Sequence, residues 1–319
     1  MKQQDFEARY IHLWEELEAF METGEAENIN HFPQDYRQVC HHLAIAKHRR
    51  YSPYLIDRLN QLVVKCHHRL YRHNPGFNFQ ILRFLIVDFP QALRDNAAFV
   101  WWSTALFVLP GVLMFLLCYL NGEMIYSVMS AGNVREFESM YDPASRALGR
   151  ERESDTDLMM FGYYIKNNIG ISFQTFASGM LFGAGSVFFL FYNGLMIGAA
   201  AGHISNIGFT ETFFPFVIGH GAFELTAIVF SGAAGLKLGL ALIDPGPYSR
   251  IRSLQNASRE AIKIIYGTTL MLVAAAFLEA FWSSSTELPV IVKYSVGSFF
   301  WLLVIMYCLF MGKRRAHGP

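Results

Sequence analysis

The chain has 319 residues, of which 53% are hydrophobic and only 16% are charged, and its formal net charge is zero. Soluble domains carry about 25% charged residues, so the composition argues against a soluble protein, and the neutral charge gives no indication of nucleic-acid binding. The charged residues crowd into a few stretches between long apolar runs. This pattern predicts an all-α polytopic helical membrane protein with a soluble N-terminal part.

The soluble part is predicted to be a cytoplasmic helical domain over residues 1–75. Its charged start lacks the apolar core of a signal peptide, so we expect no cleavable signal. Apolar residues recur at helical spacing over residues 5–21, 36–43 and 55–70, the last stretch following a proline start signal at Pro53. Three amphipathic helices of this size can form a small bundle. The predicted stripe positions are Phe6, Tyr10, Leu13, Trp14, Leu17, Met21, Tyr36, Val39, Cys40, Leu43, Leu55, Leu59, Leu62, Val63, Cys66 and Leu70.

The four cysteines, Cys40, Cys66, Cys118 and Cys308, have no disulfide-like spacing, and we expect free thiols. Cys40 and Cys66 each begin a Cys-His-His triplet. Cysteine and histidine are zinc ligands, but neighbouring residues of a helix point about 100° apart, and the spacing fits no zinc-binding pattern. We therefore expect two core cysteines flanked by surface histidines.

Residues 76–96 are predicted to form an interfacial amphipathic segment that leads into the membrane. The segment is dense in Phe, Ile and Leu, but Arg83, Asp88 and Arg94 interrupt it, and it is too short and too charged to span a bilayer. Its basic residues would lie near the lipid headgroups. The alternative is a fourth helix of the soluble bundle.

Three spans of the transmembrane domain are clear from their apolar length, over residues 97–120, 261–282 and 290–311. A tight hairpin joins the last two. Glu279 and Lys293 lie near that hairpin, where a charged side chain can snorkel to the interface or pair with its neighbour.

The middle of the chain requires a choice between one pass and two. Residues 163–204 would be roughly 60 Å long as a single helix, whereas a bilayer core is about 30 Å thick. Two passes that turn near residues 182–186 fit this length, and a further span follows over about 213–243. The transmembrane domain over 97–319 then has about six spans, two of them short and Gly-rich, and these two are alternatively re-entrant halves.

Charge predicts the orientation. Basic residues after the fourth span and in the C-terminal tail are expected in the cytoplasm, as is the N-terminal part. An even number of spans satisfies all three placements and leaves an acidic outer loop at about residues 121–160. We therefore expect a multi-pass protein of the bacterial inner membrane with both termini in the cytoplasm. The basic residues are Arg250, Arg252, Arg259, Lys263, Lys313, Arg314 and Arg315.

Glycines recur every four residues in two places, at Gly194, Gly198 and Gly202 and at Gly235 and Gly239. Faces of small residues let helix backbones approach closely in lipid. The pattern favours helix packing, within one chain or across a homodimer seam, over chemistry.

His220 and Glu224 stand four residues apart in an apolar run, so a helix places them on one face. A charge at mid-bilayer costs about 2.5–3.5 kcal/mol on insertion scales, and these groups therefore need polar partners. The candidate partners in an intramembrane polar cluster are Asn167, Asn168, Asn193, His203 and Thr226.

Three interpretations of the pair stay open. It is a structural clamp between helices, or it lines a polar cavity that moves a proton, an ion or a small solute, or it belongs to an intramembrane metal or hydrolytic site. The spacing His-xxx-Glu can ligate zinc, but residue 224 is Glu where the zincin pattern has a second His, and a third ligand would be His203 or another residue. The sequence has no Walker A motif, dinucleotide fingerprint or nucleophile elbow, so we assign no catalytic residue, metal or cofactor.

Four of these motifs occur together: Asn167-Asn168, Tyr-Asn-Gly at 192–194, His-Gly-x-x-Glu at 220–224 and Ser-Gly-Ala-Ala-Gly-Leu at 231–236. In this combination the chain resembles the stage II sporulation protein M family of bacterial and archaeal membrane proteins. The N-terminal stretch over 32–72 is similar to the version found in Gram-negative bacteria that do not sporulate.

The resemblance implies a scaffold. In endospore formers the namesake holds peptidoglycan-remodelling partners at the septum, and genes of the Gram-negative relatives tend to neighbour those of a MoxR-type ATPase, von Willebrand A-domain proteins and a transglutaminase-like protein. We therefore expect a non-enzymatic inner-membrane scaffold of an envelope-associated complex, homodimeric and in contact with membrane lipid. The alternative is a channel or transporter that uses the polar cluster, and an intramembrane metal-dependent hydrolase is less favoured.

Overall fold

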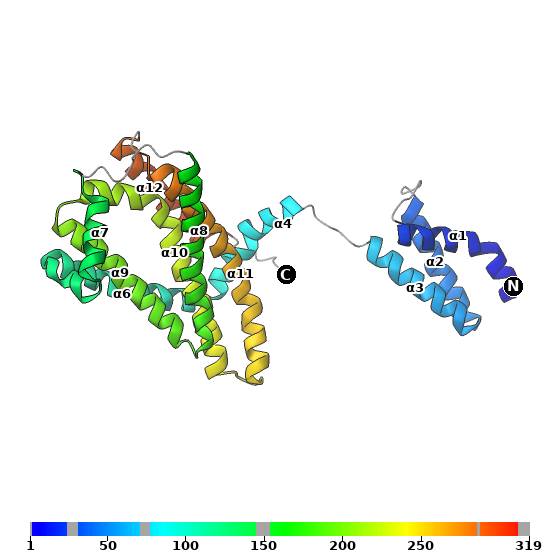
Figure 1. Cartoon of the computed structure of the whole chain (residues 1–319). Coiled ribbons are helices and arrows are strands. Elements are labelled where there is room, and N and C mark those ends of the chain that lie inside the picture. The colour runs from blue at the N-terminus through cyan, green and yellow to red at the C-terminus, as the bar shows by residue number, and fades with distance from the viewer. Residues whose placement is uncertain (1, 24–30, 71–76, 145–153, 286–287, 312–319) are drawn as a thin grey trace. The chain divides into compact units, whose positions relative to one another are not determined.

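A computed structural model of the chain describes residues 2–23, 31–70, 77–144, 154–285 and 288–311 (Figure 1). Every regular element in these ranges is a helix, which confirms the all-α prediction. The chain divides into two compact units, Met1–Gln80 and Ile81–Pro319, and each is described below by itself.

The N-terminal unit is built on three helices, α1 (Gln3–Thr23), α2 (Phe32–His48) and α3 (Pro53–Leu70). The start of α3 is tied to the start of α1, because the Ser52 backbone N–H donates to the Gln3 side chain over 2.9 Å and the Gln3 amide donates back to the Ser52 hydroxyl over 2.9 Å. The predicted stripes meet in one core. Its buried members are Phe6, Trp14, Leu17, Phe32, Val39, Leu43, Ala46, Leu55, Leu59, Leu62 and Cys66.

One histidine of the Cys-His-His triplets lies in this core, contrary to the prediction that all of them are at the surface. His42 is buried, and its Nδ1 accepts a hydrogen bond from Nε1 of Trp14 over 3.2 Å. Burial lowers the pKa of His42 below its usual value. The indole N–H needs an acceptor once it is buried, and a neutral imidazole supplies one.

The second unit carries the membrane helices. Its elements are the end of α4 (Phe77–Arg83), the π-helix η2 (Phe84–Asp88), α5 (Phe89–Asp95), α6 (Ala97–Leu120), η3 (Gly122–Ser127), α7 (Ala131–Tyr141), α8 (Ser154–Ala177), η4 (Ser178–Met180), α9 (Ala184–Asn206), α10 (Thr210–Ile243), α11 (Arg250–Phe277), the π-helix η5 (Leu278–Ser283) and α12 (Val290–Phe310).

Five helices in the described residues are long and apolar enough to cross a membrane: α6, α9, α10, α11 with η5, and α12. Helix α6 has the predicted bounds. The other four helices agree with the predicted bounds to within a few residues, except that α11 begins at Arg250, well before the predicted start at residue 261. The chain turns between α8 and α9 at Gly183, whose φ of 81° favours glycine. The two Gly-rich middle helices are not short, since α8 has 24 residues and α9 has 23.

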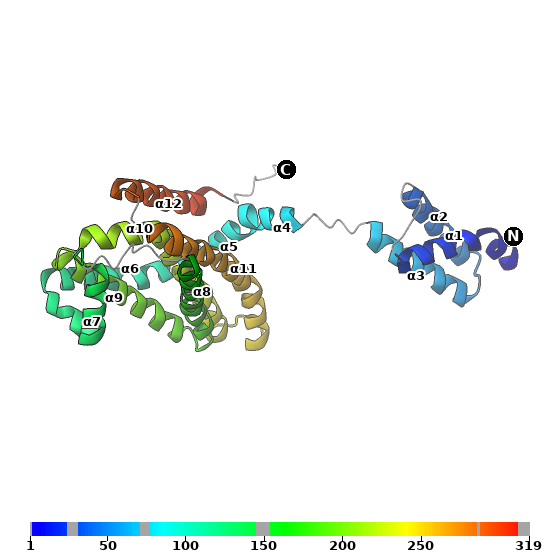
Figure 2. The same ribbon diagram turned by 45° about the horizontal axis from the view of Figure 1, so that its top comes forward.

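The direction of packing supports a sixth pass through α8, which is not among those five. Helices α6 and α9 lie side by side (Figures 1 and 2) and run in the same direction, since Gly194 lies against Phe107 and Gly202 against Phe115. Two parallel helices need a return between them. Helix α8 supplies it and runs parallel to α10, with Ser172 hydrogen-bonded to Ser231 and Gly183 against Gly239.

Contacts at the two ends of the bundle agree with this order. At the end where α6 begins, the Lys237 ammonium donates to Oδ1 of Asn96 over 2.6 Å and forms an ion pair with Glu260. At the end where α6 finishes, Asn206 donates to the carbonyl of Tyr119 over 2.9 Å. The starts of α6 and α11 and the finish of α10 therefore share one side of the unit.

The segment predicted to be interfacial packs onto this unit. Phe89 is buried, with its ring centroid 6.3 Å from that of Phe230 and 6.1 Å from that of Tyr307. Gly267 leaves the space that the Phe89 ring fills. One face of α5 thus packs into the hydrophobic core of the second unit. Ile86 and Val87 of the preceding π-helix η2 are exposed.

Candidate functional site

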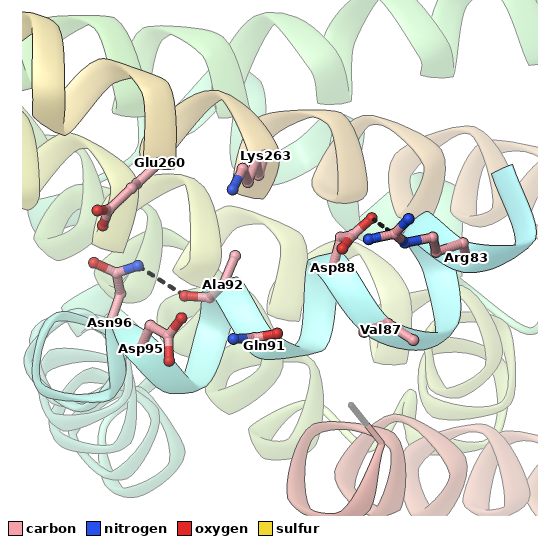
Figure 3. Close-up of a pocket in the computed structure, with 9 residues that line it drawn as sticks. All are labelled: Arg83, Val87, Asp88, Gln91, Ala92, Asp95, Asn96, Glu260 and Lys263. Carbon is pink, nitrogen blue, oxygen red and sulfur yellow. Dashed lines mark hydrogen bonds and ion pairs between the residues drawn. The ribbon is translucent and has the colours of Figure 1, made fainter. Parts of the chain in front are cut away.

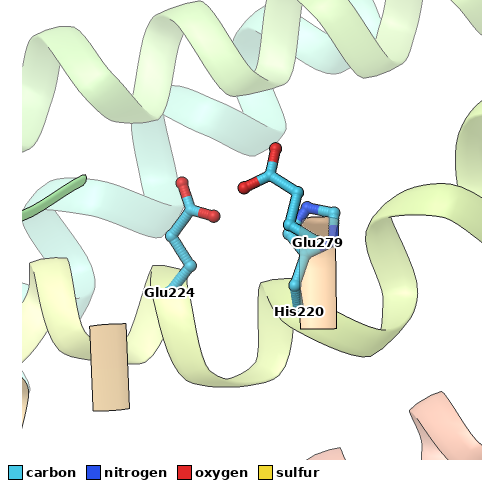
Figure 4. Close-up of side chains that lie close together, drawn as sticks. All are labelled: His220, Glu224 and Glu279. Carbon is cyan, nitrogen blue, oxygen red and sulfur yellow. The ribbon is translucent and has the colours of Figure 1, made fainter. Parts of the chain in front are cut away.

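Three ionisable side chains come together between α10 and η5. His220 and Glu224 lie on one face of α10, as predicted, and Glu279 on η5 faces them, with one ligand atom of each residue within 4.8 Å of the others. Figure 4 shows the two carboxyl groups pointing into the same space. The site lies about 15–20 Å along α10 from its start, at a rise of 1.5 Å per residue.

The π-helical turn orients the residues that face α10. Glu279 and Ser283 both lie within η5, and the Ser283 hydroxyl is 3.0 Å from Nδ1 of His220. The Ser283 carbonyl accepts from the Lys293 ammonium over 2.8 Å. Lys293 therefore pairs with a carbonyl, and the predicted alternative of a Glu279–Lys293 pair is wrong, because no ion pair of the described residues includes either group.

One predicted partner joins the cluster. Asn168 on α8 is only 2% exposed and lies next to Glu279. Its Nδ2 and the Oε2 atom of Glu279 have no hydrogen bond within 3.5 Å among the described residues, but the Asn168 amide is close enough to interact with the Glu279 carboxyl group. An amide donor and a carboxyl acceptor are complementary, so Asn168 is the polar neighbour of Glu279 in the cluster.

Helix α7 closes the site from the side where α6 finishes. Tyr141 is buried, with its ring 4.9 Å from that of Phe213 and 6.2 Å from that of Phe216, which in turn lies 5.2 Å from the ring of His220. Burial, assisted by the nearby Glu279 carboxyl, raises the pKa of Tyr141 well above its ordinary value. The phenol stays protonated and can act only as a neutral hydrogen-bonding group.

The other predicted partners make contacts elsewhere. His203 lies 2.7 Å from the Glu138 carboxylate and so joins α9 to α7. The Asn193 amide donates over 2.7 Å to the carbonyl of Phe189 in its own helix. Asn167 is exposed and donates to Asn168 over 3.1 Å, and Thr226 donates to the carbonyl of Ala222 in its own helix.

Cavities also flank the helices that build the site. One of about 180 Å³ is lined by Glu211, Phe216, Ser283 and Lys293 among others, and so ends at the serine that bonds His220. A second of about 390 Å³ lies between the segment at residues 83–96 and α11, with side chains of both charge signs around it (Figure 3). Its lining residues are Arg83, Val87, Asp88, Gln91, Ala92, Asp95, Asn96, Glu260 and Lys263.

The glycine ladders are packing seams within the chain. A Cβ atom at Gly194, Gly198 or Gly202 would overlap the carbonyl oxygen of Phe107, Gly111 or Phe115 on α6. A Cβ atom at Gly235 would overlap the Ser186 hydroxyl on α9 and crowd two carbonyl oxygens at the end of α8, and one at Gly239 would overlap the turn at Gly183. These seams fix α8 and α9 around α10, and thereby hold Asn168 beside the cluster.

Chemically, the cluster can clamp α10 to η5, hold a proton between two carboxyl groups, or bind a cation. An imidazole and two carboxylates in a water-poor setting need a compensating charge or proton, since isolated buried charges are costly. The sequence pattern found two of the three residues. It missed Glu279 because a lone carboxylate near a helix end is usually explained by snorkelling, and the π-helical turn that aims it at α10 has no sequence signal.

A model of the family "Stage II sporulation protein M" matches residues 97–284, and a model described as a domain of unknown function (DUF8413) matches residues 4–72. No curated protein and no solved structure matches the chain. The first match covers more than half of the chain and contains all three residues of the cluster. The chain therefore belongs to the stage II sporulation protein M family.

Proposed function

We propose that the protein is a non-enzymatic scaffold of the bacterial inner membrane, which holds members of an envelope-associated complex. The observation that supports this proposal most is the division of the chain into a compact helical unit with its own core and a separately compact membrane unit. An anchor joined to an independent helical bundle is the arrangement that partner recruitment needs.

The membrane unit supports an anchoring role. Its helices α6 and α9 meet backbone to backbone through the glycine seam, and such dense interfaces resist rearrangement. The soluble unit supports a recruiting role, because α3 exposes two apolar side chains, Tyr54 at 80% and Val64 at 47%. Exposed aromatic residues are frequent anchors of protein interfaces.

The proposed partners are a MoxR-type ATPase and a second copy of the chain. The test is affinity purification of the full-length protein from membranes, with Tyr54→Asp combined with Val64→Asp as the surface variant and Asn60→Asp as an exposed control on the same helix. The scaffold predicts that the ATPase is recovered with wild type and control and is reduced at least tenfold with the double variant. Equal recovery from all three would contradict it. Native mass spectrometry of the purified protein reports the dimer.

The proposed orientation places the N-terminal unit and the starts of α6 and α11 in the cytoplasm. The basic residues Arg250, Arg252, Arg259 and Lys263 support it by the positive-inside rule. Reporter fusions test it: a fusion after Asp244 should report cytoplasm, and a fusion after Asp142 should report periplasm. The reverse result would overturn the orientation.

A second candidate function is a channel or transporter. One observation favours it, which is that the 180 Å³ cavity reaches Ser283, one side chain away from His220. Proteoliposomes with a pH-sensitive dye inside would show proton flux that Glu224→Gln abolishes. A proton flux no greater than that of empty vesicles would rule out proton transport by this protein.

A further inference from the structure

We propose that His220, Glu224 and Glu279 form a binding site for one divalent transition-metal ion, of the class of Zn²⁺ or Mn²⁺. Imidazole and carboxylate are the ligands that such ions share, and this is the one group of three or more such side chains that converges in the described residues. The inference is independent of the scaffold role and goes beyond it.

The donor set fits such an ion in size. Ligand atoms bind Zn²⁺ at about 2.0–2.2 Å, whereas the three atoms lie within 4.8 Å of one another. A bound ion would therefore draw them inward by roughly 1 Å, a movement that rotation of the two glutamate side chains provides. A fourth position stays open to water or to a neighbouring polar group.

The surroundings orient the histidine for this role. The Ser283 hydroxyl lies 3.0 Å from Nδ1 of His220, so the proposal assigns Nε2 to the ion. A metal-binding histidine almost always has its other ring nitrogen bonded in this way. Ser283 and Glu279 both come from the π-helical turn η5, and π-helical turns are frequent at functional sites.

The charge balance also points to a cation. Glu224 and Glu279 face each other in the interior of the bundle, and Lys293, the nearby ammonium, is bonded to the Ser283 carbonyl instead. Oε2 of Glu279 has no hydrogen bond within 3.5 Å among the described residues. A divalent ion would neutralise the two carboxylates and give Oε2 its missing contact.

Metal content of the full-length protein tests the site. The protein is purified in detergent through a tag without histidine, stripped with a chelator, incubated with Zn²⁺ or with Mn²⁺, desalted and measured by elemental analysis. We expect about one ion per chain, and at least a tenfold loss of affinity in Glu224→Gln and in Glu279→Gln. Ser283→Ala should weaken binding about tenfold, as expected when the partner of a ligating histidine is removed.

Two controls separate this site from other ionisable side chains. Glu260→Gln removes a carboxylate of the membrane unit that pairs with Lys237 outside the cluster, and it should leave the affinity unchanged. His41→Ala with His67→Ala removes exposed imidazoles of the N-terminal unit and should also leave it unchanged. Loss of the ion in either control would overturn the assignment.

X-ray absorption of the wild-type protein gives a result that does not depend on whether a variant folds. The proposal predicts one nitrogen and two or three oxygen ligands around the ion. Several imidazole ligands, or fewer than about 0.1 ion per chain after incubation with either metal, would show that the three side chains share protons instead of a metal.

Discussion

Gly198 is the position at which the packing of the membrane unit can be tested with a single methyl group. A Cβ atom there would overlap the backbone carbonyl of Gly111 on α6, and backbone cannot turn aside as a flexible side chain can. Overpacking of this kind costs about 1–3 kcal/mol. Alanine gains about 1 kcal/mol over glycine in helix propensity, so Gly198→Ala should destabilise by about 0–2 kcal/mol.

Gly170 on α8 is the matched control, because a Cβ atom there would meet nothing within 4 Å. Gly170→Ala receives the propensity gain without the overlap and should be neutral or stabilising. The difference between the two variants therefore isolates the overpacking cost of about 1–3 kcal/mol. For a unit of this size, 1 kcal/mol corresponds to about 2–4 °C in melting temperature.

Thermal unfolding of the two variants in the same detergent is the assay. We expect Gly198→Ala to melt roughly 2–12 °C below Gly170→Ala. Equal melting temperatures, with both variants within 1 °C of wild type, would refute the conclusion that α6 and α9 meet backbone to backbone.

Three further predictions concern groups outside the membrane core. Cys66 is fully buried, and burial raises the pKa of its thiol to about 11. Maleimide at pH 8 should therefore label the partly exposed Cys40 first. Faster labelling of Cys66, measured by mass spectrometry, would contradict the packing of the three-helix bundle. The Arg58 hydrogen bond and charge lower the pKa of Glu18 below 4.5, so this pair stabilises the N-terminal unit by up to about 1 kcal/mol above pH 4.5. That stabilisation is lost as the pH falls through the lowered pKa, and Arg58→Ala should reduce this acid dependence in hydrogen exchange of α3. Glu138→Gln removes the charged partner of His203 and should speed proteolysis of α7 several-fold, whereas unchanged cleavage would show that α7 is held by other contacts.

Much of the fold could be predicted because its signals are local. Membrane-length apolar runs, such as the one that became α6, identify themselves by length, and the stripes around Trp14 and Leu59 show a helical period. The six-pass order stays a prediction from charge: five helices of the described residues are long and apolar enough to cross a membrane, and the parallel packing of Gly194 on Phe107 favours a return through α8. The lengths of α8 and α9 were underestimated, because both are continuous with polar or glycine-rich residues that hydropathy undervalues.

Only the part of the site that lies on a single helix could be predicted from the sequence. His220 and Glu224 share a face by simple periodicity, whereas Glu279 reaches them through a π-helical turn and a long-range contact between α10 and η5. His203 and Asn193 were expected nearby because they are polar and intramembrane. Instead, His203 contacts the Glu138 carboxylate, and the Asn193 amide donates to the carbonyl of Phe189.

Site-specific photo-crosslinking from Tyr54 in living cells tests the scaffold most directly, because this side chain is the most exposed aromatic among the described residues of the N-terminal unit. A photoreactive amino acid placed there should form one discrete adduct with the MoxR-type ATPase, and the same residue placed at the buried Leu59 should form none. Adducts with phospholipid alone, or no adduct while the protein remains folded in the membrane, would contradict the account.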